Sequence, residues 1–505
     1  MKHLFSFGCV CVILAAASAR AARAEEAKKA EFTPPPARDI RTIEAFPPSV
    51  TLNGQDDSAQ LVLTGKMASR DQDLTGSVTY AVSDPKIAKV TPHGRVIPLA
   101  DGKTEIVAQY GDKSSGKSIK IAVACAHMTE NLPINFGNQI VPIFTKLGCN
   151  GGGCHGKSGG QNGFALSLLG FVPELDYQTL VKENRGRRLF PANPEHSLLL
   201  LKATGTMAHG GGKRMEVGSD EYKLVRRWIA SSAPFGSEKD PTVVKVTVYP
   251  ENRILTRNNV QQFSVIAHYS DGSTLDVTQR AQYESNDQEI AIVDGAGLVR
   301  TLGLSGDAGI MARYQANVAV FRATVPLGVK IPTYAFEERT VVDRFTKKKW
   351  EQLGVVPSDL SSDEQFLRRV SLDLTGTLPT PAKIKTFMEN KDPQKRDKLI
   401  DELLESPEYS YLFANKWADI LRVKRRGQPD RASGTFAFHT WIREAIAKDM
   451  PYDRFVREIL AATGDESQSP TAVWYKELTE PQQFVDDTAQ LFLGLRLACA
   501  QCHHH

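Results

Sequence analysis

The sequence predicts a chain of several domains: two small all-β sandwiches, one small all-α unit between them, and an all-α C-terminal region. Residues 40–126 and 243–328 contain short apolar runs that alternate with polar residues and are broken by Gly, Asp, Ser and Pro, a pattern typical of half-buried strands. Residues 130–236 and 335–505 instead place apolar residues at helical spacing. The length of 505 residues is enough for three or four domains.

The composition is that of a globular protein and excludes several other classes. Apolar residues make up 41% of the chain and charged residues 24%. These fractions allow hydrophobic cores and exclude global disorder, a collagen-like chain and a polytopic membrane protein. The formal net charge is only +4, so charge gives no reason to expect a nucleic-acid partner.

The N-terminal 24 residues have the three parts of a secretory signal peptide. A basic start at Lys2 is followed by an apolar run over residues 4–17 and by the small-residue cleavage site Ala22-Arg23-Ala24. No later stretch reaches the roughly 20 apolar residues that a spanning helix needs. We therefore expect an exported protein, in the periplasm or at the cell surface, without a membrane span. Residues 25–39 are rich in Ala, Lys, Glu and Pro and predict a linker.

The two predicted sandwiches are copies of one another. Seven residues of the first recur in the second at a constant offset, which marks an internal repeat. The matching residues are Tyr80, Asp84, Ile87, Ala88, Val90, Gly94 and Val96 in the first copy and Tyr283, Asp287, Ile290, Ala291, Val293, Gly297 and Val299 in the second.

The repeated segments, SDPKIAKVTPHGRV and NDQEIAIVDGAGLV, resemble the bacterial Ig-like domain of group 2. In that family a strand carrying Ile-Ala-x-Val precedes a turn centred on glycine, which predicts that Gly94 and Gly297 are turn residues and not ligand contacts. The resemblance implies an Ig-like sandwich at residues 40–126 and another at 243–328. Such domains serve as spacers or adhesive modules, so a cell-surface polysaccharide or protein is the partner that the resemblance implies.

Residues 130–236 predict short helices around a glycine-rich middle. An apolar stripe that includes Ile140, Ile143 and Phe144 leads directly into Cys149. Ser219 is predicted to cap a later helix that carries Trp228.

The C-terminal region, residues 335–505, predicts an all-α domain. Ser361 and Glu364 are spaced as a capping box, and Pro381 is placed to open a further helix. Apolar stripes at helical spacing, such as the one through Trp417, predict a helical core.

The glycine-rich middle contains the sequence Cys149-Asn-Gly-Gly-Gly-Cys154-His155, a CxxxxCH motif. In c-type haem attachment, two thiols form thioethers with the haem vinyl groups and the adjacent histidine binds the iron. Glycines allow the loop with two extra residues. A disulfide between Cys149 and Cys154 is the alternative, and the motif alone favours neither. The helix before the motif and the helices after it favour haem, because together they are the plan of a small cytochrome c.

A haem at this motif needs a second axial ligand from a loop downstream. The segment TMAHGGGKRM offers candidates, of which His209 is the first choice and Met215 the second. Three glycines beside His209 would let the backbone approach the edge of the porphyrin.

A second motif ends the chain. Cys499-Ala-Gln-Cys502-His503 is a complete CxxCH, which predicts a second haem c with His503 as its axial ligand. A disulfide or half of a zinc site is the alternative. Because the walls of such a site would have to come from residues beyond His505, we expect the chain to be part of a longer protein.

Longer strings resemble one protein family. CNGGGCHGK, PEHSLLLLKATG, MAHGGGKRM and EYKLVRRWIA are similar to the planctomycete-type cytochrome c domain. FLRRVSLDLTGTLPTP and FLGLRLACAQCH resemble the domain of unknown function that accompanies it in exported planctomycete proteins. The resemblance implies a cytochrome c-like fold at residues 130–236 and, in the complete protein, further sequence after the CxxCH motif.

The sequence thus favours an exported protein that carries haem c and transfers single electrons to and from an unidentified redox partner. The alternative is a surface binding or adhesion protein without haem, whose cysteines form disulfides and which is connected with polysaccharide use. Whether the C-terminal domain is an enzyme stays open, because no pair of carboxylates or nucleophile with a base can be assigned there.

Overall fold

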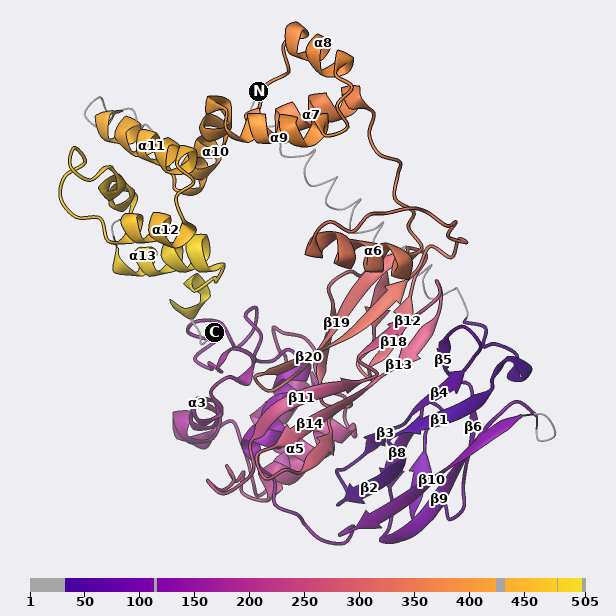
Figure 1. Ribbon diagram of the computed structural model, residues 1–505. Coiled ribbons are helices and arrows are strands. Elements are labelled where there is room, and N and C mark those ends of the chain that lie inside the picture. The colour runs from indigo at the N-terminus through magenta and orange to yellow at the C-terminus, as the bar shows by residue number, and fades with distance from the viewer. Residues whose placement is uncertain (1–31, 113–115, 424–431, 479, 502–505) are drawn as a thin grey trace, which may run out of the picture. The chain divides into compact units, whose positions relative to one another are not determined.

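The computed structural model describes residues 32–112, 116–423, 432–478 and 480–501 (Figure 1). The predicted signal peptide and the first part of the predicted linker lie outside these residues. The chain divides after Pro357 into two compact units. Among the described residues, no helix has the length and apolar character needed to cross a membrane.

The first unit begins with a β-sandwich, confirming the predicted fold of this region. Its three sheets have the strand orders β1-β4-β5, β2-β10-β9-β6 and β3-β8-β7. Their strands are β1 (Thr42–Phe46), β2 (Ser49–Asn53), β3 (Ala59–Gln60), β4 (Val62–Lys66), β5 (Asp71–Asp73), β6 (Thr79–Val82), β7 (Ala88–Val90), β8 (Arg95–Pro98), β9 (Gly102–Tyr110) and β10 (Lys117–Ala126).

The second sandwich has the same topology. Its sheets have the orders β11-β14-β15, β12-β20-β19-β16 and β13-β18-β17, so each strand has a counterpart ten numbers earlier. Its strands are β11 (Val243–Tyr249), β12 (Asn252–Ile254), β13 (Val260–Gln262), β14 (Ser264–Tyr269), β15 (Thr274–Asp276), β16 (Gln282–Ser285), β17 (Ala291–Val293), β18 (Leu298–Thr301), β19 (Gly306–Tyr314) and β20 (Asn317–Val325).

Residues of the repeat occupy equivalent places in the two sandwiches. Tyr80 and Tyr283 each donate a hydrogen bond to the carbonyl oxygen of a threonine five residues earlier. Gly94 has a φ angle of 77° and Gly297 one of 79°. Because side chains are strained in this left-handed region, the conformation explains why both turns carry glycine.

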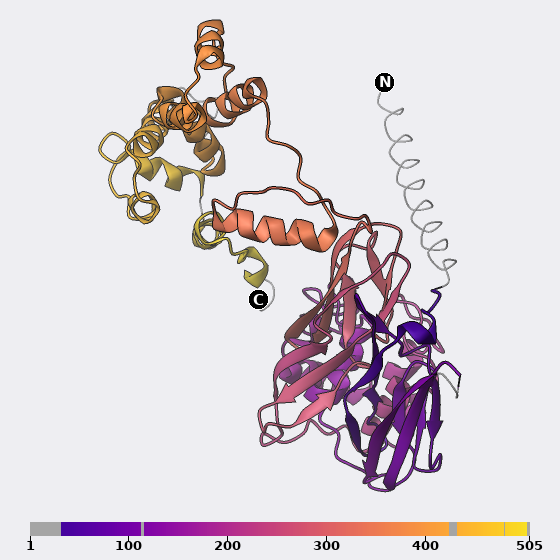
Figure 2. The ribbon, with the colours of Figure 1, turned by 45° about the vertical axis from the view of Figure 1, so that its right-hand side comes forward.

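The two sandwiches contact each other through a reciprocal pair of hydrogen bonds. Asp73 accepts a hydrogen bond from the backbone N–H of Gln262 at 2.8 Å, and Asp276 accepts one from the backbone N–H of Gln60 at 2.7 Å. Figure 2 shows the two sandwiches side by side. Both carboxyl groups lie at the contact, and burial there raises the pKa of Asp73 and raises that of Asp276 to about 6.

Replacing Asp276 with asparagine should alter how stability depends on pH. The pKa of Asp276 is about 6 in the folded chain against 3.8 ordinarily. Its contribution to stability is therefore complete below pH 3.8 and is lost as the pH rises through 6. Asparagine does not ionise, so the variant should gain up to about 3 kcal/mol over the wild type between pH 4 and pH 7.

Amide hydrogen exchange of peptides that contain β3 and β15, compared between the two proteins at each pH, measures this gain. A difference that stays constant across that range would contradict the prediction.

Between the sandwiches, residues 130–236 form short helices around glycine-rich loops. Their core contains Phe136, Phe144 and Trp228, and the predicted cap is confirmed, since Ser219 accepts a hydrogen bond from the Tyr222 backbone N–H. The cytochrome c-like fold itself stays a prediction. The helices are η2 (Phe136–Ile140), α2 (Val141–Lys146), η3 (Leu168–Gly170), α3 (Pro173–Tyr177), η4 (Gln178–Lys182), η5 (Glu183–Gly186), η6 (Pro194–His196), α4 (Leu198–Ala203) and α5 (Asp220–Ala230).

The helix α6 (Val341–Leu353) also belongs to the first unit, because Leu327 donates a backbone hydrogen bond to Leu353 at its end.

The second unit is helical, as predicted. Its helices are α7 (Asp363–Thr375), α8 (Pro381–Glu389), α9 (Lys395–Leu404), α10 (Pro407–Ile420), α11 (Ala432–Ala447), α12 (Tyr452–Leu460), η8 (Pro470–Glu477), α13 (Pro481–Thr488), η9 (Ala489–Leu493) and η10 (Ala498–Gln501).

The predicted capping box of α7 is wrong by one residue. The capping pair is Ser362 and Gln365, not Ser361 and Glu364. Arg396 accounts for the difference, because it donates to the backbone carbonyl of Ser361 and pairs with Asp363, which places Ser361 outside the helix.

Candidate functional site

One cavity in the helical segment brings together five residues that the sequence proposed for a single site. It has a volume of about 540 Å³, within the usual range for small-molecule sites. Its lining includes Cys149, Cys154, His155, His209 and Met215.

The glycine-rich loop forms one wall of the cavity. The backbone N–H of His155 donates to the carbonyl of Cys149 at 3.0 Å, which folds the loop back on itself. A Cβ at Gly156 would lie 1.9 Å from the carbonyl oxygen of Asn150, so this position requires glycine. The thiols of Cys149 and Cys154 are free in the structure, and both side chains are partly buried.

The same burial favours uncharged forms of the groups in this wall. It raises the pKa of the Cys149 thiol to about 11 and lowers the pKa of His155. A neutral imidazole keeps a lone pair on one ring nitrogen, so His155 is suited to act as a metal ligand.

Hydrogen bonds to carbonyl oxygens determine which ring nitrogen of His155 and of His209 carries a proton. Nδ1 of His155 lies 2.9 Å from the carbonyl oxygen of Phe164, and Nδ1 of His209 lies 2.8 Å from that of Gly212. A carbonyl oxygen can only accept, so both Nδ1 atoms carry a proton, and Nε2 is the nitrogen left for a metal in the neutral ring. This is the usual arrangement of histidines that bind metals through Nε2.

The two imidazole rings are nearly parallel across the cavity. Their centroids are 6.3 Å apart and their planes differ by 7°. The two histidines that the sequence proposed as iron ligands therefore lie next to each other in the same cavity.

Met215 lines the same cavity but belongs to the hydrophobic core. Its side chain is 4% exposed and packs in the cluster that contains Trp228. The structure thus gives His209 a geometric relation to His155 and gives Met215 a packing role.

The charged side chains that line the cavity are all cationic: Arg187, Arg188, Lys202 and Arg214. Arg214 belongs to the basic pair Lys213-Arg214, which the sequence places where it could meet haem propionates. Arg187 and Arg188 belong to an RGRR run, which ordinarily indicates a solvated surface. Arg188 departs from this expectation, since it is only 5% exposed. Sequence spacing alone carries no signal that this arginine is buried.

The second predicted motif belongs to the second unit of the chain. Cys499 is exposed in η10 and has a free thiol. Cys502 and His503 fall outside the described residues, so the second haem stays a prediction.

Comparison with protein families identifies parts of the chain. Residues 41–121 and 242–313 match the bacterial Ig-like domain (group 2). Residues 341–505 match PSCyt2, a protein of unknown function (DUF1549). These matches confirm the Ig-like resemblance of both sandwiches and that of the C-terminal region to a domain of unknown function. The resemblance of residues 130–236 to a cytochrome c domain stays a prediction.

No curated protein matches the chain. Among solved structures, it is similar to the S-layer protein rSbsC(31-844), with 12% identity over 59% of this chain and 29% of that one and a TM-score of 0.16. The N-terminal four Ig domains of Dscam1 isoform 4.4 show 7% identity over 55% and 43% of the two chains and a TM-score of 0.12. At such low TM-scores the likeness says nothing about activity.

The match to this chain covers less than a third of the length of that S-layer protein. What the comparisons establish is a protein with two bacterial Ig-like domains of group 2 and one DUF1549 domain, which fits a protein of the cell surface.

Proposed function

We propose that residues 130–236 bind one haem c and transfer single electrons in an exported protein, with the Ig-like domains holding this unit at the cell surface. The observation that carries the proposal is the parallel pair His155 and His209, whose centroids are 6.3 Å apart and whose Nδ1 atoms each donate to a carbonyl oxygen, which leaves Nε2 as the nitrogen for a metal.

The number of ligands favours haem over a bare metal ion. Among the described residues, no group of three or more His, Cys, Asp or Glu side chains could hold a metal ion. A structural zinc ion needs four ligands and a catalytic one needs three. A porphyrin supplies four nitrogens itself and requires from the protein only two axial ligands, which is the number that this cavity offers.

The remaining lining also suits haem. Cys149 and Cys154 would each form a thioether with a vinyl group, and His155 and His209 would hold the iron. The four cationic side chains of the lining complement the two propionate carboxylates of haem. Haem bound there supplies one-electron redox chemistry, and the apolar wall around it excludes water and so helps set the potential.

Expression of the full chain with c-type maturation machinery tests the proposal. The Cys499→Ser variant removes the second motif as a source of haem, so its product should be red, and its mass should include one haem that remains attached on denaturation. Changing Cys149 and Cys154 to serine in that background should abolish the covalent adduct. The matched control is Cys125→Ser, which removes a buried thiol in β10 and should leave the adduct in place.

A colourless Cys499→Ser protein without a haem adduct would refute the proposal. It would favour a surface binding protein without haem, in which the Ig-like domains contact a polysaccharide or protein partner. A second haem at Cys499, Cys502 and His503 is a separate proposal. It would be supported by an adduct that persists after Cys149 and Cys154 are replaced in a chain whose second motif is intact.

A further inference from the structure

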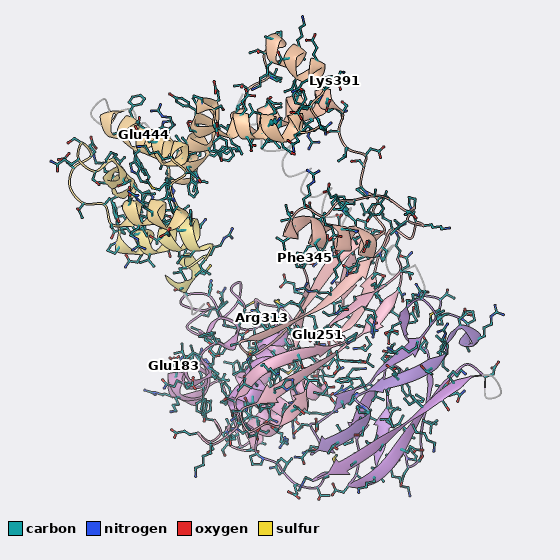
Figure 3. The ribbon with its side chains drawn as sticks, viewed as in Figure 1. Glu183, Glu251, Arg313, Phe345, Lys391 and Glu444 are labelled. Atoms are coloured by element: carbon teal, nitrogen blue, oxygen red, sulfur yellow. The ribbon has the colours of Figure 1, made fainter. Side chains whose placement is uncertain are left out.

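The cavity wall contains a buried arginine that forms no salt bridge with any of the described residues. Arg188 is 5% exposed, and arginine is almost never buried this fully unless it is paired. Its Nη1 donates to the carbonyl of Thr179 at 2.7 Å, and its Nη2 donates to the carbonyl of Gly163 at 2.8 Å. A weaker contact reaches the carbonyl of Glu183 in η5, which is labelled in Figure 3. All these acceptors are neutral carbonyls, and the charge of the Glu183 side chain acts on the guanidinium only through space.

Arg188 also contacts the residue that orients His155. Its guanidinium carbon lies 4.7 Å from the centroid of the Phe164 ring. That ring in turn lies 4.5 Å from the imidazole of His155, and the carbonyl of Phe164 is the acceptor for Nδ1. Arg188 therefore holds Phe164 in two ways: through its ring and through the backbone carbonyl of the preceding residue, Gly163.

The loop that carries Phe164 is joined to His155 at its end, where the Leu166 backbone N–H donates to the His155 carbonyl at 2.8 Å. It is a short turn in which Gln161 and Phe164 exchange two backbone hydrogen bonds. Its two central residues, Asn162 and Gly163, are exposed. The buried guanidinium thus joins this surface turn to the carbonyl of Thr179 in η4, which belongs to the packed interior.

We propose that Arg188 is a positioning residue that keeps the Phe164 carbonyl on Nδ1 of His155 and so presents Nε2 to the cavity as a ligand. The proposal rests on the proposed haem site for its purpose, but the positioning itself is a property of the protein alone. With haem bound, the positive charge of Arg188 would also favour the reduced iron and raise its potential.

The first test uses the full chain expressed without haem maturation and labelled with ¹⁵N at histidine. In the wild type, His155 should be predominantly the Nδ1–H tautomer. Arg188→Gln should lower the ratio of the Nδ1–H to the Nε2–H tautomer at least about five-fold, the factor that one net hydrogen bond contributes. The matched control is Arg187→Gln, because Arg187 lines the same cavity but is exposed; it should leave the ratio unchanged.

Arg188→Lys separates charge from geometry. Lysine keeps the positive charge but cannot reach both carbonyls with a planar fork. This variant should also shift the tautomer ratio, while the reduction potential of its haem form should stay closer to the wild type than that of Arg188→Gln. If Arg188→Gln does not fold, Arg188→Lys carries the tautomer test.

A wild-type tautomer ratio in whichever of these variants folds would overturn the proposal. The outcome is independent of the haem site: a shifted ratio in a protein that never acquires haem would uphold the positioning role and refute the proposed function.

Discussion

Replacing His209 with alanine is expected to open the sixth coordination position of the proposed haem iron. The oxidised wild-type protein should be low-spin and should lack the weak charge-transfer band near the red edge of the visible spectrum that marks a methionine ligand. The alanine variant should lose the low-spin spectrum and regain it on addition of imidazole. Because a thioether is a weaker donor to ferric iron than an imidazole, His209→Met should raise the potential, by roughly 100 mV or more within the 0.8 V that axial ligands span.

Met215→Ala is the control for this experiment. Met215 lines the same cavity but is packed in the core, so its loss should cost about 2–5 kcal/mol of stability and leave the spectrum almost unchanged. A methionine-type band in the wild type that disappears in Met215→Ala and survives in His209→Ala would contradict the assignment of His209.

Replacing Trp228 with alanine is expected to cause the largest loss of stability in the helical segment. Trp228 is completely buried, lies 5.3 Å from Phe136 between ring centroids, and donates from Nε1 to the carbonyl of Pro234 at 2.8 Å. Its removal leaves a cavity and takes away the hydrogen bond to the part-buried Pro234 carbonyl. We expect the free energy of unfolding to fall by about 3–5 kcal/mol. The lost hydrogen bond to the Pro234 carbonyl should bring the value toward the upper end of this range.

Amide hydrogen exchange in α5 should report this loss, since it measures opening of this segment separately from the other domains. Trp228→Phe is the matched control, because it keeps an aromatic ring against Phe136 and removes only the N–H donor. It should lose clearly less stability than the alanine variant. Equal losses would mean that the hydrogen bond to Pro234, and not the packing, dominates.

The sequence predicted the sandwiches because their signals are local. Alternation along a strand decides which side chains face the core, as at Val265 and Ala267, both completely buried in β14. The turns at Gly94 and Gly297 follow from the left-handed backbone that glycine accepts. The capping box of α7 shows the limit of such signals, since Ser361 and Ser362 both allow a cap and a contact with Arg396, distant in sequence, selects the second.

The residues of the candidate site also fall into two groups: those that the sequence predicted and those that only the structure brought together. Cys149, Cys154 and His155 form a motif that is visible in seven consecutive residues, so the sequence by itself determined this group of candidates. Only the tertiary structure decided which downstream side chain faces His155, because the parallel ring of His209 lies 54 residues further along the chain and no periodicity relates the two.

The sequence likewise could not predict that Arg188 is buried. Nor could it predict the reciprocal hydrogen bonds that Asp73 and Asp276 accept between the two sandwiches. Burial of a charged group depends on what packs over it from other parts of the chain, whereas sequence patterns record only which neighbours a residue has along the chain.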